Sequence, residues 1–329
     1  MKTRKIYTAI LGLRHNDSIE NDVPYAPRYK KELTTTIFDL KRRGITYGTL
    51  EIRYLRKVPE RMQPLWTNHI IETSDEGYLK LNFKIDKSKI TEIQKIDDRE
   101  NAQWLLKVII YHLFVVLNIA KPSAYLSTGG LYYSGNKVFH KITPIHHSMG
   151  FAFEKAIETQ WPKLNLLSFK QVWDWYFQFD SEILTLPTSP IGRALNAFSH
   201  LIRSSATDES YSELLWIMIG LEALYCQGKS KYDEQLNTKT ALFLGKRGSF
   251  KKKFNKMYGY RSRFIHGRLN LQSQFIYVDD SVDVNQHLDE YWSTRSLALA
   301  TFIATLQRLV IENRQSNPSF DIPMHSSDA

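Results

Sequence analysis

The spacing of apolar residues changes near residue 187, and this change constrains the fold more than any other feature of the chain. Before it, runs of β-branched and aromatic residues with partial alternation indicate strands at 5–12, 33–40, 48–55 and 78–85. After it, apolar residues recur with helical spacing at 191–203, 211–226, 235–244, 250–265 and 287–313. Pro187 and Pro190 mark the junction. The sequence therefore predicts an α+β fold, with a β-rich N-terminal region followed by an all-helical region.

Three parts follow from this division. Residues 1–186 are expected to form a mixed domain in which a helix at 100–119, apolar nearly all round, is buried beside the strands. Residues 187–315 are expected to form a helical domain, and residues 316–329 a loose tail. Hydrophobic residues make up 43% of the 329 residues, which is enough to build a substantial core.

Cysteine and histidine usage restricts the compartment and the cofactors. The single cysteine, Cys226, excludes an internal disulfide and a multi-cysteine zinc site, and it fits a reducing compartment. The basic and then apolar start of the chain lacks a cleavage pattern, and the apolar run at 108–120 is too short to span a bilayer. His140, His146 and His147 have no carboxylate or cysteine at ligand spacing. We therefore expect a cytoplasmic protein with no metal, no cofactor and no membrane partner.

Positive charge is concentrated in one stretch. Residues 228–268 contain 12 lysines and arginines against two acidic residues, so this stretch alone accounts for the formal charge of +10 of the whole chain. Such a concentration attracts a phosphate backbone, although a lysine-rich helix face exposed to solvent has the same composition. The candidate RNA contacts in this stretch are Lys251, Lys252, Lys253, Lys256, Arg263 and Arg268.

The basic stretch ends in an arginine and a histidine, Arg261 and His266, followed by Gly267. An arginine offers a charged fork that matches two phosphate oxygens, and a histidine exchanges protons near neutral pH. Five residues on an ideal helix turn the two side chains about 140° apart, so they do not share one face. They converge if the helix ends at His266 with Gly267 in the left-handed cap conformation, or if a second protomer supplies one of them.

Two segments resemble a known family. Residues 216–225, an apolar helix with the central Glu222, resemble the "LEALF"-type helix of the Apea-like HEPN family. Residues 257–267 resemble its "YxxRSxxxHG" signature, and the order and separation of the two segments agree with the family. The resemblance covers about 190–313, and residues 1–180 resemble no family that we can name.

The resemblance implies a helical bundle that forms a homodimer or a higher homo-oligomer, with the signature helices of two protomers meeting in one composite cleft. Many members are metal-independent endoribonucleases that act as toxins or in abortive infection and other antiviral defence, whereas others keep the fold without the activity. By this resemblance Arg261 and His266 are the catalytic residues, with Ser262 at the small polar position of the signature. The substrate's 2′-OH would attack the phosphorus, leaving a 2′,3′-cyclic phosphate and a 5′-OH.

Several roles stay open at this point. Ser262 orients His266 or touches phosphate, or it is an exposed serine. Glu222, grouped with the candidate catalytic residues, needs a cationic partner because an unpaired carboxylate in an apolar helix is costly. Arg261 is the favoured partner, and packing support or an ion pair with Arg203 is the alternative. Tyr258 and Tyr260 stack on RNA bases or belong to the core.

The expected function is thus RNA cleavage, restrained or triggered through the N-terminal domain by a phage or host protein. The alternatives are an inactive HEPN module that dimerises and binds nucleic acid or a nucleotide, and an adaptor that docks an acidic protein.

Overall fold

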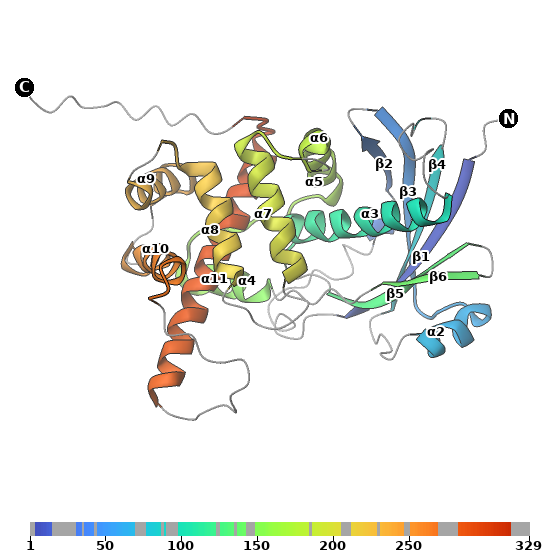
Figure 1. Ribbon diagram of the computed structural model, residues 1–329, viewed down its shortest axis with the longest axis horizontal. Helices are drawn as coiled ribbons and strands as arrows, with labels where there is room; N and C mark the ends of the chain where they lie inside the picture. The colour runs from blue at the N-terminus through green and yellow to red at the C-terminus, as the bar shows by residue number, and fades with distance from the viewer. Residues whose placement is uncertain are drawn as a thin grey trace, which may run out of the picture.

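The computed structural model confirms an α+β fold. It describes residues 4–14, 31–34, 36–42, 45–69, 77–86, 89, 98–122, 126–134, 137–142, 149–183, 186–204, 212–228, 231–246, 251–268 and 282–316. An antiparallel sheet comes first in the chain and a helical region follows it, joined by one long helix that runs from the sheet into the helices (Figure 1).

Within the described residues the sheet has six strands in the order β2-β3-β4-β1-β5-β6, all antiparallel. The strands are β1 (Arg4–Arg14), β2 (Ile37–Arg42), β3 (Ile45–Leu55), β4 (Tyr78–Asp86), β5 (Leu126–Ser134) and β6 (Lys137–Ile142). Alternation along these strands buries one face, because residues such as Leu50, Leu81 and Phe83 point to the same side.

Strands β5 and β6 were not predicted, because Gly129 and Gly130 interrupt the β-type pattern there. The sheet itself requires a glycine at residue 130. A Cβ atom at this position would lie 2.2 Å from the carbonyl oxygen of Ile10 on β1. Strand β5 therefore depends on its close approach to β1. Propensity rules disfavour glycine in strands, so they do not predict β5.

The strand predicted at 33–40 is wrong at its start, since β2 begins only at Ile37 and residues 31–34 are helical. The local cause is Glu32, whose carboxylate accepts hydrogen bonds from Ser168 Oγ at 2.7 Å and from the Phe169 backbone N–H at 2.5 Å. Its other oxygen lies 3.0 Å from Lys121 Nζ. These contacts hold the turn of residues 31–34 against the end of the buried helix.

That buried helix is α3 (Asp98–Ala120), which lies beside the sheet and reaches the other helices (Figure 1), and its apolar side chains belong to the main core. The opposite face of the sheet carries a smaller cluster, in which Ile10, Tyr78 and Tyr133 pack against Trp66 of α2 (Gln63–His69). The sheet therefore has a large core cluster on one face and a small cluster on the other.

Short helices follow α3, and the helices after residue 187 confirm the predicted helical pattern, with boundaries shifted by a few residues. They are α4 (Gly150–Thr159), α5 (Phe169–Tyr176), α6 (Asp180–Ile183), α7 (Pro190–Ser204), α8 (Ser212–Tyr225), α9 (Tyr232–Leu244), α10 (Lys251–Ile265) and α11 (Val282–Ile311). Helix α11 runs through the centre, with α7 and α8 beside it and α9 and α10 at the side remote from the sheet (Figure 1).

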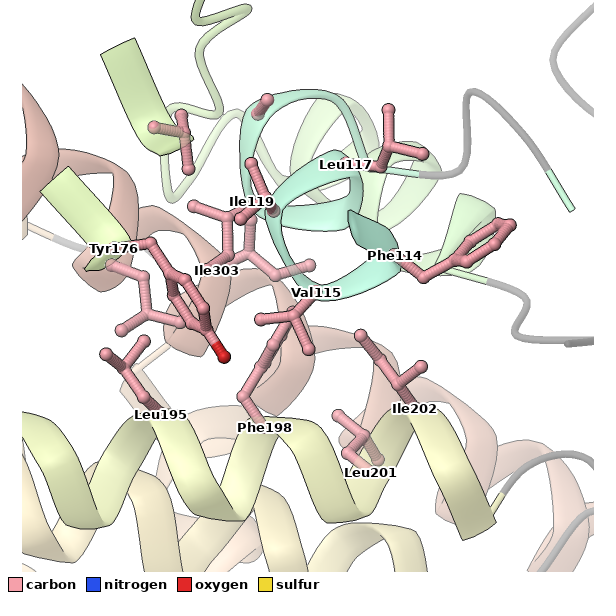
Figure 2. Close-up of a cluster of buried hydrophobic side chains, with 14 of the residues drawn as sticks. Phe114, Val115, Leu117, Ile119, Tyr176, Leu195, Phe198, Leu201, Ile202 and Ile303 are labelled. Atoms are coloured by element: carbon pink, nitrogen blue, oxygen red, sulfur yellow. The ribbon is translucent and has the colours of Figure 1, made fainter. Parts of the chain in front are cut away.

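One continuous core joins the two regions. The end of α3, with Phe114, Val115 and Ile119, packs between α7 and α11, and Tyr176 of α5 completes the cluster (Figure 2). Gln307 of α11 is fully buried. Its side-chain nitrogen donates hydrogen bonds to the carbonyls of Ile119 and Asn165 at 2.8 Å, and its side-chain oxygen accepts one from the Asn165 N–H at 2.7 Å. The boundary predicted at residue 187 stays a prediction, and side chains from both sides of it share this core.

A buried histidine in α3 makes the fold sensitive to acid. His112 Nδ1 and the Tyr176 hydroxyl share a hydrogen bond of 2.6 Å, and burial lowers the pKa of His112 from 6.5 to about 4. Between pH 6.5 and 4, His112 binds a proton in the unfolded chain but not in the folded chain. The contribution of His112 to stability is therefore complete above pH 6.5 and falls by about 3 kcal/mol as the pH drops to 4.

We accordingly expect the His112→Gln variant to show a flatter dependence of the unfolding free energy on pH between 6.5 and 4 than the parent chain, measured by urea titration. His200 is exposed, so His200→Gln serves as the matched control and should keep the parent slope. An unchanged slope in His112→Gln would mean that His112 takes up its proton in the folded state.

Candidate functional site

The candidate site is built on α10, which lies against α8, α9 and α11. Phe254, Met257 and Tyr260 recur at helical spacing and are all buried, so they fix which side of α10 faces the bundle. The opposite side carries the exposed residues Asn255 and Arg263. The sequence thus anchors a basic helix by a narrow apolar stripe and leaves its other face to solvent.

The end of α10 has the predicted glycine cap. Gly267 has φ +62°, the Gly267 N–H donates to the Phe264 carbonyl at 3.1 Å, and the Arg268 N–H donates to the Arg263 carbonyl at 2.7 Å. These two bonds form a Schellman motif, in which His266 is the C-cap residue that directly follows the last residue of α10. The cap leaves the His266 side chain exposed at the C-terminal end of α10, where the helix dipole favours a cation.

The predicted pairing of Glu222 with Arg261 is confirmed. Arg261 Nη2 lies 3.1 Å from Glu222 Oε2 on α8, and the two side chains are 21% and 12% exposed. Burial raises the pKa of the Glu222 carboxyl, and the guanidinium opposes that rise. Glu222 Oε1 and Arg261 Nε have no hydrogen-bond partner within the described ranges. The pair therefore fixes Arg261 through one contact, while the unpartnered Nε is buried and 21% of the side chain stays exposed.

Arg261 and His266 do not face the same side of one chain. Arg261 is turned toward α8 by Glu222, whereas His266 is exposed beyond the last turn. The described residues offer the His266 imidazole no hydrogen bond or ion pair. The cap alone therefore does not unite the two side chains.

The outward face of α10 is lined by small residues. Asn255, Gly259, Ser262 and His266 recur four, three and four residues apart, so they lie on one face. A Cβ atom added to Gly259 would meet nothing within 4 Å. The sequence alone gives this spacing, but only the burial of Phe254, Met257 and Tyr260 shows that these positions lie on the side turned away from the bundle. A second helix can approach the backbone closely along such a face.

One predicted RNA contact needs correction. Tyr260 is 1% exposed, and its ring packs in the core near Tyr291 of α11 with the Arg263 guanidinium 4.6 Å from the ring centre. Its ring therefore cannot stack on a base in this conformation. Tyr258 is half-buried, and the Arg261 guanidinium lies 5.8 Å from its ring centre, so an aromatic edge remains beside the arginine.

The other basic candidates divide into three groups. Lys256 is tied to Glu290 of α11 in an ion pair, which offsets part of its charge. Arg263 and Arg268 are exposed. Lys251, Lys252 and Lys253 form the first turn of α10, and their side chains lie outside the described residues. Glu290 was not predicted from the sequence, because nothing in the pattern of α11 places it opposite α10.

Other side chains near Arg261 do not add a nucleophile. Burial and the Glu222 carboxylate raise the pKa of the Cys226 thiol to about 12, so it stays protonated at neutral pH. His146 and His147, and the side chain of His140, lie outside the described residues. Among the described residues no cluster of three or more histidine, cysteine, aspartate or glutamate side chains is arranged to hold a metal ion.

None of the helices in the described ranges combines the length and the apolar character needed to cross a bilayer. Comparisons of the chain with models of protein families, with curated proteins and with solved structures find no match. The resemblance to the Apea-like HEPN family, and the roles that it implies for Arg261, Ser262 and His266, therefore remain predictions.

Proposed function

We propose that the protein is a HEPN-type endoribonuclease, in which Arg261 of one copy and His266 of a second copy act on the same phosphodiester. The observation that supports this most strongly is the construction of α10. A Schellman cap presents an exposed histidine at the end of a basic helix, and Glu222 holds an arginine on the neighbouring side.

The face of α10 explains why a second copy is needed. His266 shares its face with Asn255, Gly259 and Ser262, which are small and offer no bulk against an approaching helix. Two copies that meet along this face around a twofold axis bring the His266 of each close to the α10 of the other. Ser262 then lies in the contact, which favours a role in positioning over a role as an isolated surface serine.

Each residue then has a chemical role. The His266 imidazole accepts the proton of the attacking 2′-OH or donates one to the leaving 5′ oxygen. The Arg261 guanidinium, oriented by Glu222, stabilises the charge that develops on the phosphoryl oxygens. Tyr258 offers a ring edge beside the phosphate site. DNA lacks the 2′-OH and is expected to resist.

The products test this chemistry directly. Incubation of the purified protein with a 5′-labelled RNA is expected to give fragments ending in a 2′,3′-cyclic phosphate, equally in the presence of EDTA. The same oligonucleotide with 2′-deoxyribose throughout should remain intact. Fragments ending in a 3′-OH, cleavage of the DNA, or loss of cleavage on chelation would contradict the proposed reaction.

RNA binding by α10 is expected to depend steeply on salt. If about four cations per chain contact phosphates, the affinity for single-stranded RNA should fall about 50-fold between 50 and 200 mM salt, because each contact adds about 0.7 to the slope of log K against log salt. The double variant Arg263→Gln, Arg268→Gln should therefore show a slope lower by about 1.4 in fluorescence anisotropy.

Lys170 of α5 supplies the matched control, since it is an exposed cation on another helix. The variant Lys170→Gln should keep the parent slope. Equal slopes for all three proteins would show that RNA does not bind along α10.

In the cell, the protein would then act as an effector of defence or as a toxin, and its N-terminal region would restrain the nuclease. Expression in bacteria of the intact chain, beside His266→Ala, tests this role through growth and RNA integrity. The second candidate, an inactive module that dimerises and binds RNA, is favoured by the pairing of Arg261 with Glu222, because this pairing offsets the charge of the arginine. It predicts RNA binding without cleavage in the intact protein.

A further inference from the structure

The connection between α4 and α5, residues 160–168, contacts the end of α3, the central helix α11 and Glu32. Its Leu167 N–H donates to the Ala120 carbonyl at the end of α3 at 3.0 Å. Its Asn165 backbone is held by Gln307 of α11. Its Ser168 hydroxyl donates to Glu32 at 2.7 Å. The connection is therefore fastened both to the sheet-bearing half and to the central helix.

The same connection reaches α9 and α10 through one side chain. Trp161 is 5% exposed, and its indole Nε1–H donates to the Gly245 carbonyl at 3.1 Å. Gly245 follows the last residue of α9 and has φ +93°. The edge-to-face contact of the Trp161 ring with Phe254, with centroids 5.8 Å apart and planes at 78°, reaches the first turn of α10.

Phe254 belongs to the stripe of α10 that carries the candidate arginine. Phe254, Tyr258 and Arg261 are spaced by four and three residues, so they follow one another along the same side of the helix. A shift of Phe254 therefore moves Arg261 along α8 and changes the geometry of its contact with Glu222. The indole fixes both the end of α9 and the beginning of α10, and the chain between them, residues 247–250, lies outside the described residues.

We propose that Trp161 is a positioning residue for the α10 site, through which the N-terminal half sets the place of Arg261. The expected effect on RNA cleavage rests on the proposed ribonuclease function, whereas the claim that Trp161 holds α10 in place does not. Trp161 touches no reacting group. It acts through Phe254 and Gly245, and a displacement of about 1 Å at a catalytic group is enough to cost up to a hundredfold in rate.

A matched pair of variants tests the proposal. Trp161→Phe removes the bond to Gly245 and reshapes the contact with Phe254. Trp175→Phe is the control, because Trp175 is also buried and its Nε1–H likewise donates to a backbone carbonyl, that of Arg314 at 2.9 Å, while its ring packs on Phe179 and not on α10. The measurements are hydrogen exchange of the α10 amides, the kcat for RNA cleavage, and the affinity for an RNA made uncleavable by 2′-O-methylation.

We expect Trp161→Phe to speed exchange in α10 at least fivefold and to lower kcat about tenfold, with the affinity for uncleavable RNA changed less than twofold. Trp175→Phe should leave exchange in α10 and kcat unchanged. Parent-like exchange in α10 of Trp161→Phe, or equal effects in both variants, would overturn the proposal. Absence of cleavage by the parent chain would refute the ribonuclease alone, since the exchange result still decides whether Trp161 holds α10.

Discussion

Replacing His266 with alanine is expected to lower the rate of RNA cleavage by about 10²–10⁴-fold, the range for loss of a general acid or base. The side chain is exposed and has no hydrogen bond or ion pair with the described residues, so its removal should not disturb the fold. The affinity for RNA should change less than about twofold, because the basic residues of α10 remain. Single-turnover cleavage and binding to a 2′-O-methylated RNA measure the two effects separately.

His200 provides the control, since it is another exposed histidine, stacked on Trp216 at 4.4 Å and far in sequence from α10. His200→Ala should cleave at the parent rate. Retention of at least a tenth of the parent rate by His266→Ala would exclude the imidazole from proton transfer. A fall in RNA affinity that matches the fall in rate would assign His266 to binding alone.

The largest effect on stability is expected at the ion pair that joins α8 to α11. Glu213 and Arg295 form this pair with side chains only 2% and 4% exposed, and the Arg295 guanidinium lies 5.0 Å from the ring centre of Trp292. Arg295 Nε and Nη1 have no hydrogen-bond partner in the part of the chain that the structure describes. The carboxylate of Glu213 therefore supplies the counter-charge that stabilises the buried Arg295 guanidinium.

The variant Glu213→Gln should lower the free energy of unfolding by about 3–5 kcal/mol, because it leaves the guanidinium buried without its counter-charge. In thermal unfolding this corresponds to a fall in Tm of about 4–7 °C. The double variant Glu213→Leu, Arg295→Met removes both charges and should recover most of the loss.

The exposed pair of Lys170 and Asp174, with side chains 54% and 51% exposed, is the matched control. Asp174→Asn should change the unfolding free energy by less than about 1 kcal/mol. A loss in Glu213→Gln no larger than that in Asp174→Asn would show that water reaches the buried pair and that α8 and α11 do not depend on it.

The elements that the sequence predicted correctly are those whose pattern follows from their own burial. The apolar period of α7, α8 and α11 indicates that each is a helix packed on the core, and the long apolar run of α3 indicates a helix buried on all sides, so each was found within a few residues. The cap at Gly267 was likewise predictable, because a glycine after a basic helical run is a local signal. The pairing of Glu222 with Arg261 followed from the cost of an isolated carboxylate in an apolar helix.

What the sequence could not predict depends on distant partners. Strand β5 needs a glycine at residue 130 because the backbone of β1 lies too close to leave room for a Cβ atom there. Rules based on neighbouring residues cannot detect this contact. The burial of Tyr260 is set by its contact with α11, so its role as a core residue could not be distinguished from base stacking beforehand. The contacts of Trp161 are likewise distant in sequence, since its indole bonds Gly245 and packs on Phe254.

The most direct test of the account mixes two inactive variants, Arg261→Ala and His266→Ala, after each has been purified. If the arginine of one copy and the histidine of another act together, subunit exchange creates mixed dimers in which one of the two sites is intact. With random exchange, about a quarter of the parent cleavage rate should return. A mixture that exchanges subunits and still fails to cleave RNA would contradict a site shared between two copies.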